Sequence, residues 1–232
     1  MRLEGRVAIV TGASRGIGVP IARALARRGM RLVVAARSAE ALQTVADELR
    51  AATGAKVLAI PTDVTDASAR AALVDATLRE FGSIDVLVNN AGVVRPSAYD
   101  QLPVDEIEGQ LVLNLVAPMA LARLVLPHML AQQRGHIVNI ASLGGLLGVA
   151  WGEPYGATKH GLVGFTRALR MSCKAQGTPV SASVVCPGFV EEVGMYVDSA
   201  LAHGHRASFL LGTSSPEAVA AATVRAIERD TP

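Results

Sequence analysis

Short apolar runs alternate with longer amphipathic segments along the chain. The runs lack the polar alternation of a half-exposed strand, which is typical of strands buried on both faces of a parallel sheet. Each amphipathic segment is long enough to cross over between two such strands. The alternation predicts an α/β fold, a single doubly wound parallel sheet with helices on both faces. The expected strands are Val7–Val10, Leu32–Ala35, Lys56–Ile60, Ile84–Val88, His136–Ile140 and Val180–Val185.

The length and the hydrophobic content of the chain indicate one domain. With 232 residues, of which 50% are hydrophobic, the chain can bury one large core, so residues 1–232 are expected to fold together. Pro20 falls in the first turn of a helix that begins near Gly16, where a missing N–H is tolerated. Residues at about 193–214 show no clear period and are expected to form a cap over a site. Further helices are expected at Ala39–Ala52, Ala67–Phe81, Val104–Gln132, Tyr155–Gln176 and Ser215–Arg229.

Composition excludes several classes of function. The net charge is +2 with no long run of one sign, so no nucleic-acid partner is expected. Cys173 and Cys186 have no metal-site or CxxC spacing and are expected as buried thiols in a reducing compartment. The start lacks a signal-peptide core, and the longest uncharged stretch, Gly135–Gly152, is too polar to span a membrane. His203 and His205 lack a third ligand nearby. The sequence therefore predicts a cytoplasmic protein without metal or membrane contact.

A glycine-rich loop, Thr11-Gly-Ala-Ser-Arg-Gly-Ile-Gly18, directly follows the first expected strand, and a helical pattern follows the loop. Glycines let a backbone approach a pyrophosphate closely, and the N-terminus of the next helix attracts its charge. The alternative is a plain strand-to-helix turn, but the position at the first junction of a parallel sheet favours a dinucleotide site. The expected contacts in the loop are Gly12, Ser14, Arg15, Gly16, Ile17 and Gly18.

The segments after the second, third and fourth expected strands are placed to bind the adenosine half of the dinucleotide and the parts next to it. An NAD-selective enzyme places an acid at the end of the second strand, where this chain has Ala-Ala-Arg37. Arg37 and Arg15 are expected to converge on a 2′-phosphate, which favours NADP over NAD. Two solvated arginines without a ligand are the alternative. Asp63, just past the third strand, is placed to accept from the adenine amino group. The same carboxyl edge of the sheet receives Asn90, Ala91 and Gly92.

Four polar residues suggest proton chemistry. Tyr155 and Lys159 share a helix face, and a cation held there is expected to lower the tyrosine pKa. Ser142, after the fifth strand, can bond a substrate oxygen, and Asn114 is a polar residue in an apolar helix. Taken singly, these are ordinary surface or self-satisfied residues. Taken together with the glycine loop, they indicate a catalytic site.

These motifs resemble those of the classical short-chain dehydrogenases/reductases, and the likeness runs from Gly5 to about Ala226. The resemblance implies a Rossmann fold and NADP(H)-dependent reduction of a carbonyl, or oxidation of the matching secondary alcohol. It implies Tyr155 as the acid or base, Ser142 as the group that polarises the carbonyl, Lys159 on the nicotinamide ribose, and Asn114 anchoring a relay water. It also implies a homodimer or homotetramer. Further cofactor contacts implied are Val64, Pro187, Gly188 and Val190.

Some points stay open from the sequence. The family often has Thr where this chain has Glu192, and family members usually add a strand after the last helix, whereas this sequence ends at Pro232. Two alternatives remain: a dinucleotide-sensing scaffold of the same fold, or an NAD-dependent alcohol dehydrogenase. A bulky apolar small molecule is the expected substrate, with Arg95 and Glu153 as polar exceptions. The residues expected around it are Val94, Leu143, Leu146, Trp151, Phe189, Met195 and Tyr196.

Overall fold

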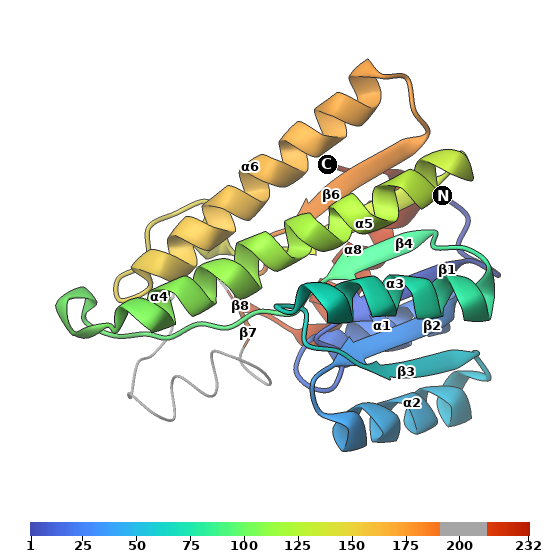
Figure 1. The fold of residues 1–232 in the computed structure, drawn as a ribbon, viewed down its shortest axis with the longest axis horizontal. Helices are drawn as coiled ribbons and strands as arrows, with labels where there is room; N and C mark the ends of the chain where they lie inside the picture. The colour runs from blue at the N-terminus through green and yellow to red at the C-terminus, as the bar shows by residue number, and fades with distance from the viewer. Residues whose placement is uncertain (191–212) are drawn as a thin grey trace.

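The computed structural model describes residues 1–190 and 213–232. Its main sheet consists of β1 (Val7–Thr11), β2 (Arg31–Ala36), β3 (Val57–Pro61), β4 (Val86–Asn89), β5 (Gly135–Ile140) and β6 (Val180–Val185). These strands are all parallel and lie in the order β3-β2-β1-β4-β5-β6 (Figure 1). The strand order reverses between β1 and β4, as in a doubly wound sheet. The predicted fold class is confirmed.

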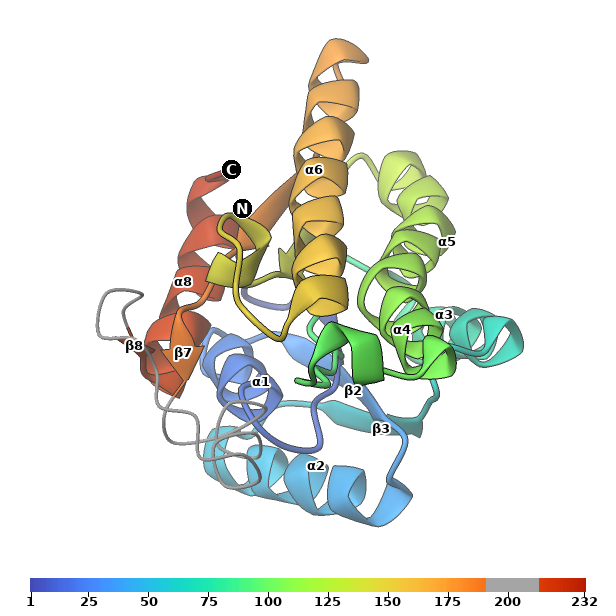
Figure 2. The ribbon, with the colours of Figure 1, turned by 90° about the vertical axis from the view of Figure 1, so that its left-hand side faces the viewer.

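Helices cover both faces of this sheet (Figure 2). They are α1 (Gly18–Ala26), α2 (Ala39–Thr53), α3 (Ala67–Phe81), α4 (Val104–Leu111), α5 (Ala117–Ala131), α6 (Glu153–Ala175) and α8 (Pro216–Arg229). One face of the sheet carries α1, α2 and α8, and the other carries α3, α5 and α6. Pro20 lies in the first turn of α1, as expected. The two layers of helices leave only the ends and edges of the sheet open.

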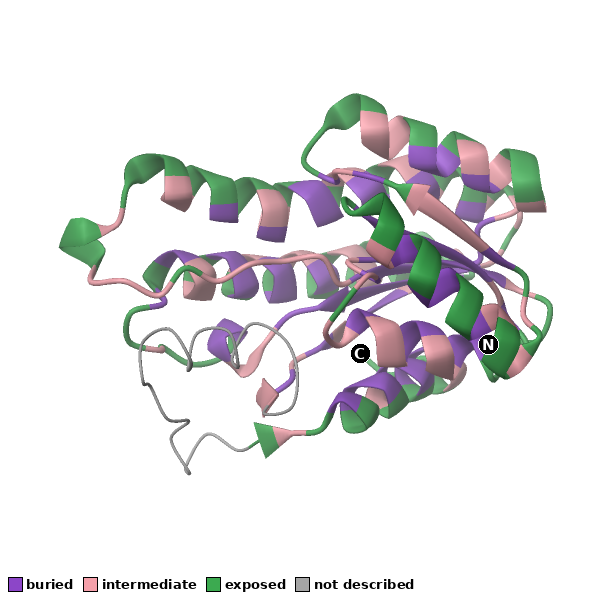
Figure 3. Cartoon of the chain, turned by 90° about the horizontal axis from the view of Figure 1, so that it is seen from below, coloured by how far each residue is buried: buried purple, intermediate pink, exposed green. Residues whose placement is uncertain are grey.

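Strand β1 shows why the runs lack polar alternation. Ala8 and Val10 pack into the core under α1 and α8, whereas Ile9 between them packs into the core under α3 and α5. All three side chains are fully buried. Both faces of β1 are therefore apolar along Ala8–Val10, and the exposed residues gather on the outer faces of the helices (Figure 3).

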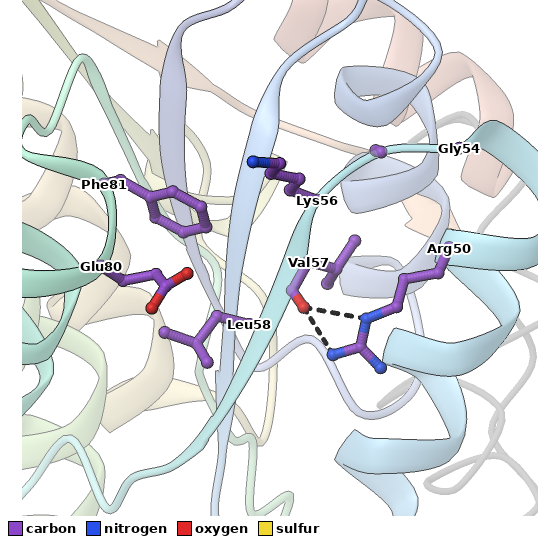
Figure 4. Close-up of a pocket in the computed structure, with 8 residues that line it drawn as sticks. Arg50, Gly54, Lys56, Val57, Leu58, Glu80 and Phe81 are labelled. Atoms are coloured by element: carbon purple, nitrogen blue, oxygen red, sulfur yellow. Dashed lines mark hydrogen bonds between the residues drawn. The ribbon is translucent and has the colours of Figure 1, made fainter.

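The outer strand β3 departs from the expectation of burial on both faces. Leu58 and Ile60 are only partly buried, because β3 pairs with β2 alone. The Arg50 guanidinium covers its open edge by donating to the Val57 carbonyl, with 3.0 Å between Nε and O (Figure 4). Pro61 at the end of the strand has no N–H to offer. These two features protect the edge against pairing with another strand.

The prediction of one continuous helix over Val104–Gln132 is wrong in detail. It consists of α4, a π-helical turn η2 (Val112–Val116), and α5. Asn114 lies in the π turn, and its side chain pairs with both backbone groups of Val93, at 2.8 Å each. The helix thus widens where its polar side chain bonds a neighbouring loop instead of water, a common context for π turns.

The same helical stretch is unusually apolar. By length and composition, Val104–Ala131 is apolar enough to cross a membrane, with a mean hydropathy of 1.6 in its 18-residue window. A core helix of a folded protein meets the same criterion, but only 39% of this window is buried inside the chain. Apolar side chains therefore remain exposed on α4, η2 and α5.

Other expectations have mixed outcomes. Cys173 is buried, whereas Cys186 is only half-buried, and both thiols are unpaired by disulfide. The expected cap lies outside the described residues except for Thr213–Ser214, which form the short strand β8. This strand pairs with β7 (Phe189–Val190) in a two-stranded parallel sheet. Five further expectations also lie outside the described residues, those for Glu192, Met195, Tyr196, His203 and His205.

A buried histidine lies near the amino end of β5, away from the carboxyl ends. His136 is 2% exposed, and its Nε2 lies 2.8 Å from Ser183 Oγ. Burial lowers the pKa of His136 to about 4, although the Asp230 carboxylate, 3.9 Å from Nδ1, raises it. The folded chain therefore holds this imidazole neutral at neutral pH.

This burial predicts an acid-sensitive fold. The unfolded pKa of histidine is about 6.5, so as the pH falls from there towards 4 the unfolded chain takes up the proton first and gains stability. We expect His136→Gln to reduce the loss of unfolding free energy between about pH 7.5 and about pH 4 by up to about 3 kcal/mol. Urea unfolding at both pH values measures this, with exposed His128→Gln as the control. Parallel pH curves for wild type and His136→Gln would contradict it.

Candidate active site

A cleft of about 810 Å³ opens at the carboxyl ends of the strands. Loops after all six strands of the main sheet contribute to it, which is the position where open α/β sheets bind ligands. Seventeen of the expected site residues line it: Gly12, Ser14, Arg15, Gly16, Ile17, Arg37, Asp63, Val64, Asn90, Ala91, Gly92, Ser142, Tyr155, Lys159, Pro187, Gly188 and Val190. Gly18 and Asn114 do not line it, and the roles expected for them stay predictions.

The glycine loop forms a close-packed cradle at the N-terminus of α1. Gly12 has a φ of +65°, and a Cβ there would lie 2.9 Å from the Ala91 Cα. A Cβ on Gly18 would lie 2.3 Å from the Gly12 carbonyl oxygen, so Gly18 serves the packing of helix against loop. No described side chain caps α1, and its first turn has no acid. Its exposed N–H groups therefore suit the pyrophosphate of a dinucleotide.

Hydrogen bonds join this loop to the end of β4. The Thr11 hydroxyl accepts from the backbone N–H groups of Asn90 and Ala91, at 3.0 and 3.1 Å. The Asn90 amide donates to the carbonyls of Thr11 and Gly12, at 3.0 and 3.1 Å. Asn90 is thus a brace between two loops as well as a lining residue. Sequence reasoning placed Asn90 at this edge but did not find its partner, the Thr11 hydroxyl.

Arg15, Arg37 and Asp63 bring charge to the end of the cleft beside β2 and β3, where the sequence predicts the adenosine of a dinucleotide. Asp63 Oδ1 accepts from the hydroxyl and the N–H of Thr65, at 2.7 and 2.9 Å. These bonds, and to a lesser degree the nearby Arg37, hold the pKa of Asp63 below its ordinary value. Thr65 and Ser38 also line this end and were not expected from the sequence. The end of β2 carries no carboxylate, as read from the sequence.

Ser142, Tyr155 and Lys159 come together at the centre of the site. Ser142 follows β5, and its Oγ accepts from the Gly144 N–H at 3.1 Å. Tyr155 lies in the first turn of α6, and a Cβ on Gly144 would lie 3.5 Å from its ring and 3.6 Å from Ser142 Oγ. Lys159, one turn later, places Nζ 5.5 Å from the centre of the Tyr155 ring. The three side chains thus share one corner of the cleft.

The pKa expectation for Tyr155 is wrong in this structure. Burial raises the pKa of the phenol, and the Ser142 hydroxyl acts in the opposite direction. Burial also lowers the pKa of Lys159 to about 8. The Lys159 ammonium is directed elsewhere, because Nζ donates to the Ile140 carbonyl at 2.9 Å. Loss of water around the phenolate therefore outweighs the stabilising hydrogen bond of Ser142.

Asn114 lies behind the cleft. Besides Val93, its amide donates to the Thr158 hydroxyl at 3.3 Å, and that hydroxyl donates to the Tyr155 carbonyl at 2.7 Å. A Cβ on Gly92 would lie 3.1 Å from Asn114 Oδ1 and 3.6 Å from Lys159 Nζ. The Asn114 side chain is thus committed to protein partners that position the helix carrying Tyr155 and Lys159.

The expected substrate wall is partly correct. Val94, Leu143, Trp151 and Phe189 line the cleft. Leu146 does not; the next residue, Leu147, lines it instead. Arg95 and Glu153 are not lining residues, and the Arg95 side chain pairs with Glu106 at 3.3 Å. Lining residues that sequence reasoning missed include Pro96, Leu113, Val149 and Ala150.

Comparison with known proteins decides the family. The model of the short chain dehydrogenase family matches residues 6–201. The chain belongs to this family. A ketoacyl reductase, HetN, from Nostoc sp. is 44% identical over 229 residues, which cover 99% of this chain and 77% of that protein. The predicted family is therefore confirmed, and the protein is an oxidoreductase with the Rossmann fold that acts on C=O or CH–OH groups.

Solved structures agree with this assignment. A variant of actinorhodin polyketide ketoreductase with NADPH superposes with a TM-score of 0.89 at 35% identity, over 96% of this chain and 90% of that one. A short chain dehydrogenase/reductase from Burkholderia phymatum, in complex with NAD, also gives 0.89, at 32% identity over 99% and 88%. The similar structures thus include both dinucleotides, and the family uses a nicotinamide dinucleotide.

Proposed function

We propose that this protein is an NADPH-dependent reductase of apolar carbonyl compounds. The observation that carries the proposal is that Ser142, Tyr155 and Lys159 line the same cleft as the glycine loop and Arg37. Its relatives include ketoacyl reductases, which supports this reaction class. When bound, the dinucleotide would supply the hydride at its nicotinamide ring.

The side chains at the centre then have distinct roles. Tyr155 donates its phenolic proton to the carbonyl oxygen of the substrate, and burial suits this role because it keeps the phenol protonated at neutral pH. Ser142 donates a hydrogen bond to the same oxygen. Lys159 holds the nicotinamide ribose and supports Tyr155 from one helical turn away. Asn114 positions α6 through Thr158. A water relay anchored on Asn114 stays a prediction.

The cofactor contacts extend from the glycine loop to the adenosine end. The loop and the N-terminus of α1 would hold the pyrophosphate, and Asp63 the adenine. Arg15 and Arg37 favour the 2′-phosphate of NADP, because guanidinium groups form strong charge-assisted bonds to phosphate. The NAD-bound relative makes an NAD-dependent alcohol dehydrogenase the second candidate.

We also propose that a second copy of the chain covers the exposed apolar face of α4, η2, α5 and α6. Large apolar side chains there are between about one third and two thirds exposed: Leu111, Val112, Val116, Met119 and Met171. The elements that carry them, α4, η2, α5 and α6, lie on one side of the molecule, and α6 contacts α4 and η2 (Figure 1). Exposed large apolar side chains on neighbouring helices are typical of a subunit interface.

Cofactor preference provides the first test. We expect NADPH to bind at least about tenfold more tightly than NADH, because one arginine–phosphate contact is worth about 1.4 kcal/mol or more. Arg37→Ala should remove most of this preference, whereas Arg79→Ala, an exposed arginine on α3, should leave it unchanged. Calorimetric titration of each variant measures both affinities. Equal affinities in the wild type would favour the NAD-dependent candidate.

Tyr155 provides the second test. Tyr155→Phe should keep NADPH affinity within a few fold yet lower kcat about 10²- to 10⁴-fold, because only proton transfer is removed. Lys159→Met should reduce both. Tyr99→Phe, at a phenol that is 60% exposed, is the matched control and should change neither. Steady-state ketone reduction and cofactor titration by fluorescence measure the effects. Wild-type turnover by Tyr155→Phe would show that another group supplies the proton.

Assembly provides the third test. Light scattering at micromolar concentration should give a mass of at least two chains. Val116→Glu, which places a charge in the 49% exposed site on η2, should shift the population to monomer. Ala52→Glu, at an exposed site on α2, should not. A monomeric wild type would refute the proposed interface.

A further inference from the structure

The loop between η3 (Leu143–Gly145) and α6 forms one wall of the cleft. Leu147, Val149 and Trp151 all line it, and the Leu147 and Trp151 side chains are about half exposed. Tyr155 follows Trp151 by four residues, so this wall borders the reacting end of the cleft. The opposite wall comes from the segment after β4, with Val94 and Pro96.

Trp151 has an unusual backbone conformation. Its φ is +58°, in the left-handed region that favours glycine and disfavours bulky side chains. The loop is held there by hydrogen bonds on both sides. The Ser97 N–H donates to the Trp151 carbonyl at 3.3 Å, and the Gly152 N–H donates to the Val149 carbonyl at 3.3 Å. The first bond joins the two walls of the cleft, so the strained residue lies where they meet.

A turn alone does not call for tryptophan at this position. Glycine would adopt the same φ without strain, and asparagine would adopt it at lower cost. Strained residues cluster at binding and catalytic sites. Three described non-glycine residues have a positive φ, Gln133, Trp151 and Asp230, and of these Trp151 is the one that lines the cleft. The indole of Trp151 is therefore the feature that needs an explanation.

Charge in the cleft is confined to its other parts. Among the described lining residues, the charged ones are Arg15, Arg37, Asp63 and Lys159, which belong to the glycine loop, the adenosine end and the catalytic group. The reacting end is instead lined by aliphatic and aromatic side chains: Val94, Pro96, Leu143, Leu147, Val149, Trp151 and Phe189. This composition suits an uncharged apolar group beside the reacting carbonyl.

We propose that Trp151 determines substrate specificity: its indole packs against a flat aromatic ring attached to the reacting carbonyl carbon. This inference rests on the proposed carbonyl reduction at Tyr155. An aromatic side chain attracts an aromatic ring through stacked or edge-to-face contacts, beyond the area that it buries. The ring would lie between the loop of Trp151 and the wall after β4, two segments that the Ser97–Trp151 hydrogen bond links.

The kinetic test compares two methyl ketones with the same number of carbon atoms, acetophenone and 2-octanone. The wild type should favour acetophenone in kcat/KM. Trp151→Leu should lower this preference about tenfold, and Trp151→Phe should keep it within a few fold. Leu146→Ala, on the same loop but outside the cleft, is the control and should not change it. An unchanged ratio in Trp151→Leu would overturn the proposal.

Fluorescence tests the inference without turnover, because the chain contains one tryptophan. Titration with 1-phenylethanol in the presence of NADPH, which cannot accept hydride from an alcohol, should shift and quench the Trp151 emission to saturation, at lower concentration than 2-octanol does. If neither alcohol changes the Trp151 emission, the inference is overturned even if ketones are reduced. Conversely, a protein whose emission responds but which reduces neither ketone would contradict the proposed function alone.

The backbone strain has its own measurement. Trp151→Gly and Trp151→Ala remove the same indole, but only glycine accepts the left-handed φ freely. The glycine variant should melt a few degrees above the alanine variant. Equal melting temperatures would show that the loop relaxes to another conformation, so that the left-handed φ at residue 151 costs no stability.

Discussion

Burial of the sheet on both faces decides where chemistry can occur in this chain. Side chains in the middle of β1, such as Ile9 and Val10, are enclosed by helices above and below and are apolar. The buried polar side chains of β4 and β5, such as Asn89 and Asn139, bond to each other and to other protein groups. Polar groups that can meet a ligand therefore gather where the strands end. Because all six strands are parallel, their carboxyl ends share one edge, and the loops there receive residues from distant parts of the sequence. The cleft follows from this constraint.

Close approach of backbones then gives the edge its shape. Gly12 and Gly18 let α1 begin against the loop after β4, where side chains would collide. Thr11 and Asn90 fix the two loops by reciprocal bonds between side chain and backbone. This arrangement leaves the N–H groups at the start of α1 exposed, whereas α2, α3 and α8 each receive a side-chain cap from Ser38, Asp66 and Ser215. Helices α4, α5 and α6 also begin without a side-chain cap, so the glycine loop beside its N-terminus is what makes α1 suited to an anion.

Local patterns in the sequence were enough for the strand runs, the glycine loop and the juxtaposition of Ser142 with Tyr155 and Lys159, because each depends on short-range spacing or on the common strand edge. They failed where tertiary packing decides. The π turn at Asn114 depends on Val93, 21 residues away. The direction of the Tyr155 pKa shift depends on burial that helical spacing does not encode. Leu147 instead of Leu146 faces the cleft because the loop carrying both has no regular period.

Lys159 is held in place by the packing of the fold around it more than by its own hydrogen bonds. An ammonium that is 2% exposed is costly, and its lowered pKa, about 8, expresses that cost. Its described hydrogen bond goes to one carbonyl, that of Ile140, although three donors are available. The position is maintained by packing around it: a Cβ on Gly145 would lie 2.7 Å from the Lys159 carbonyl oxygen, so η3 lies directly against α6. The remaining N–H donors of this buried ammonium are then available to bond a ligand. The packing of the core offsets the free-energy cost of burying the charge.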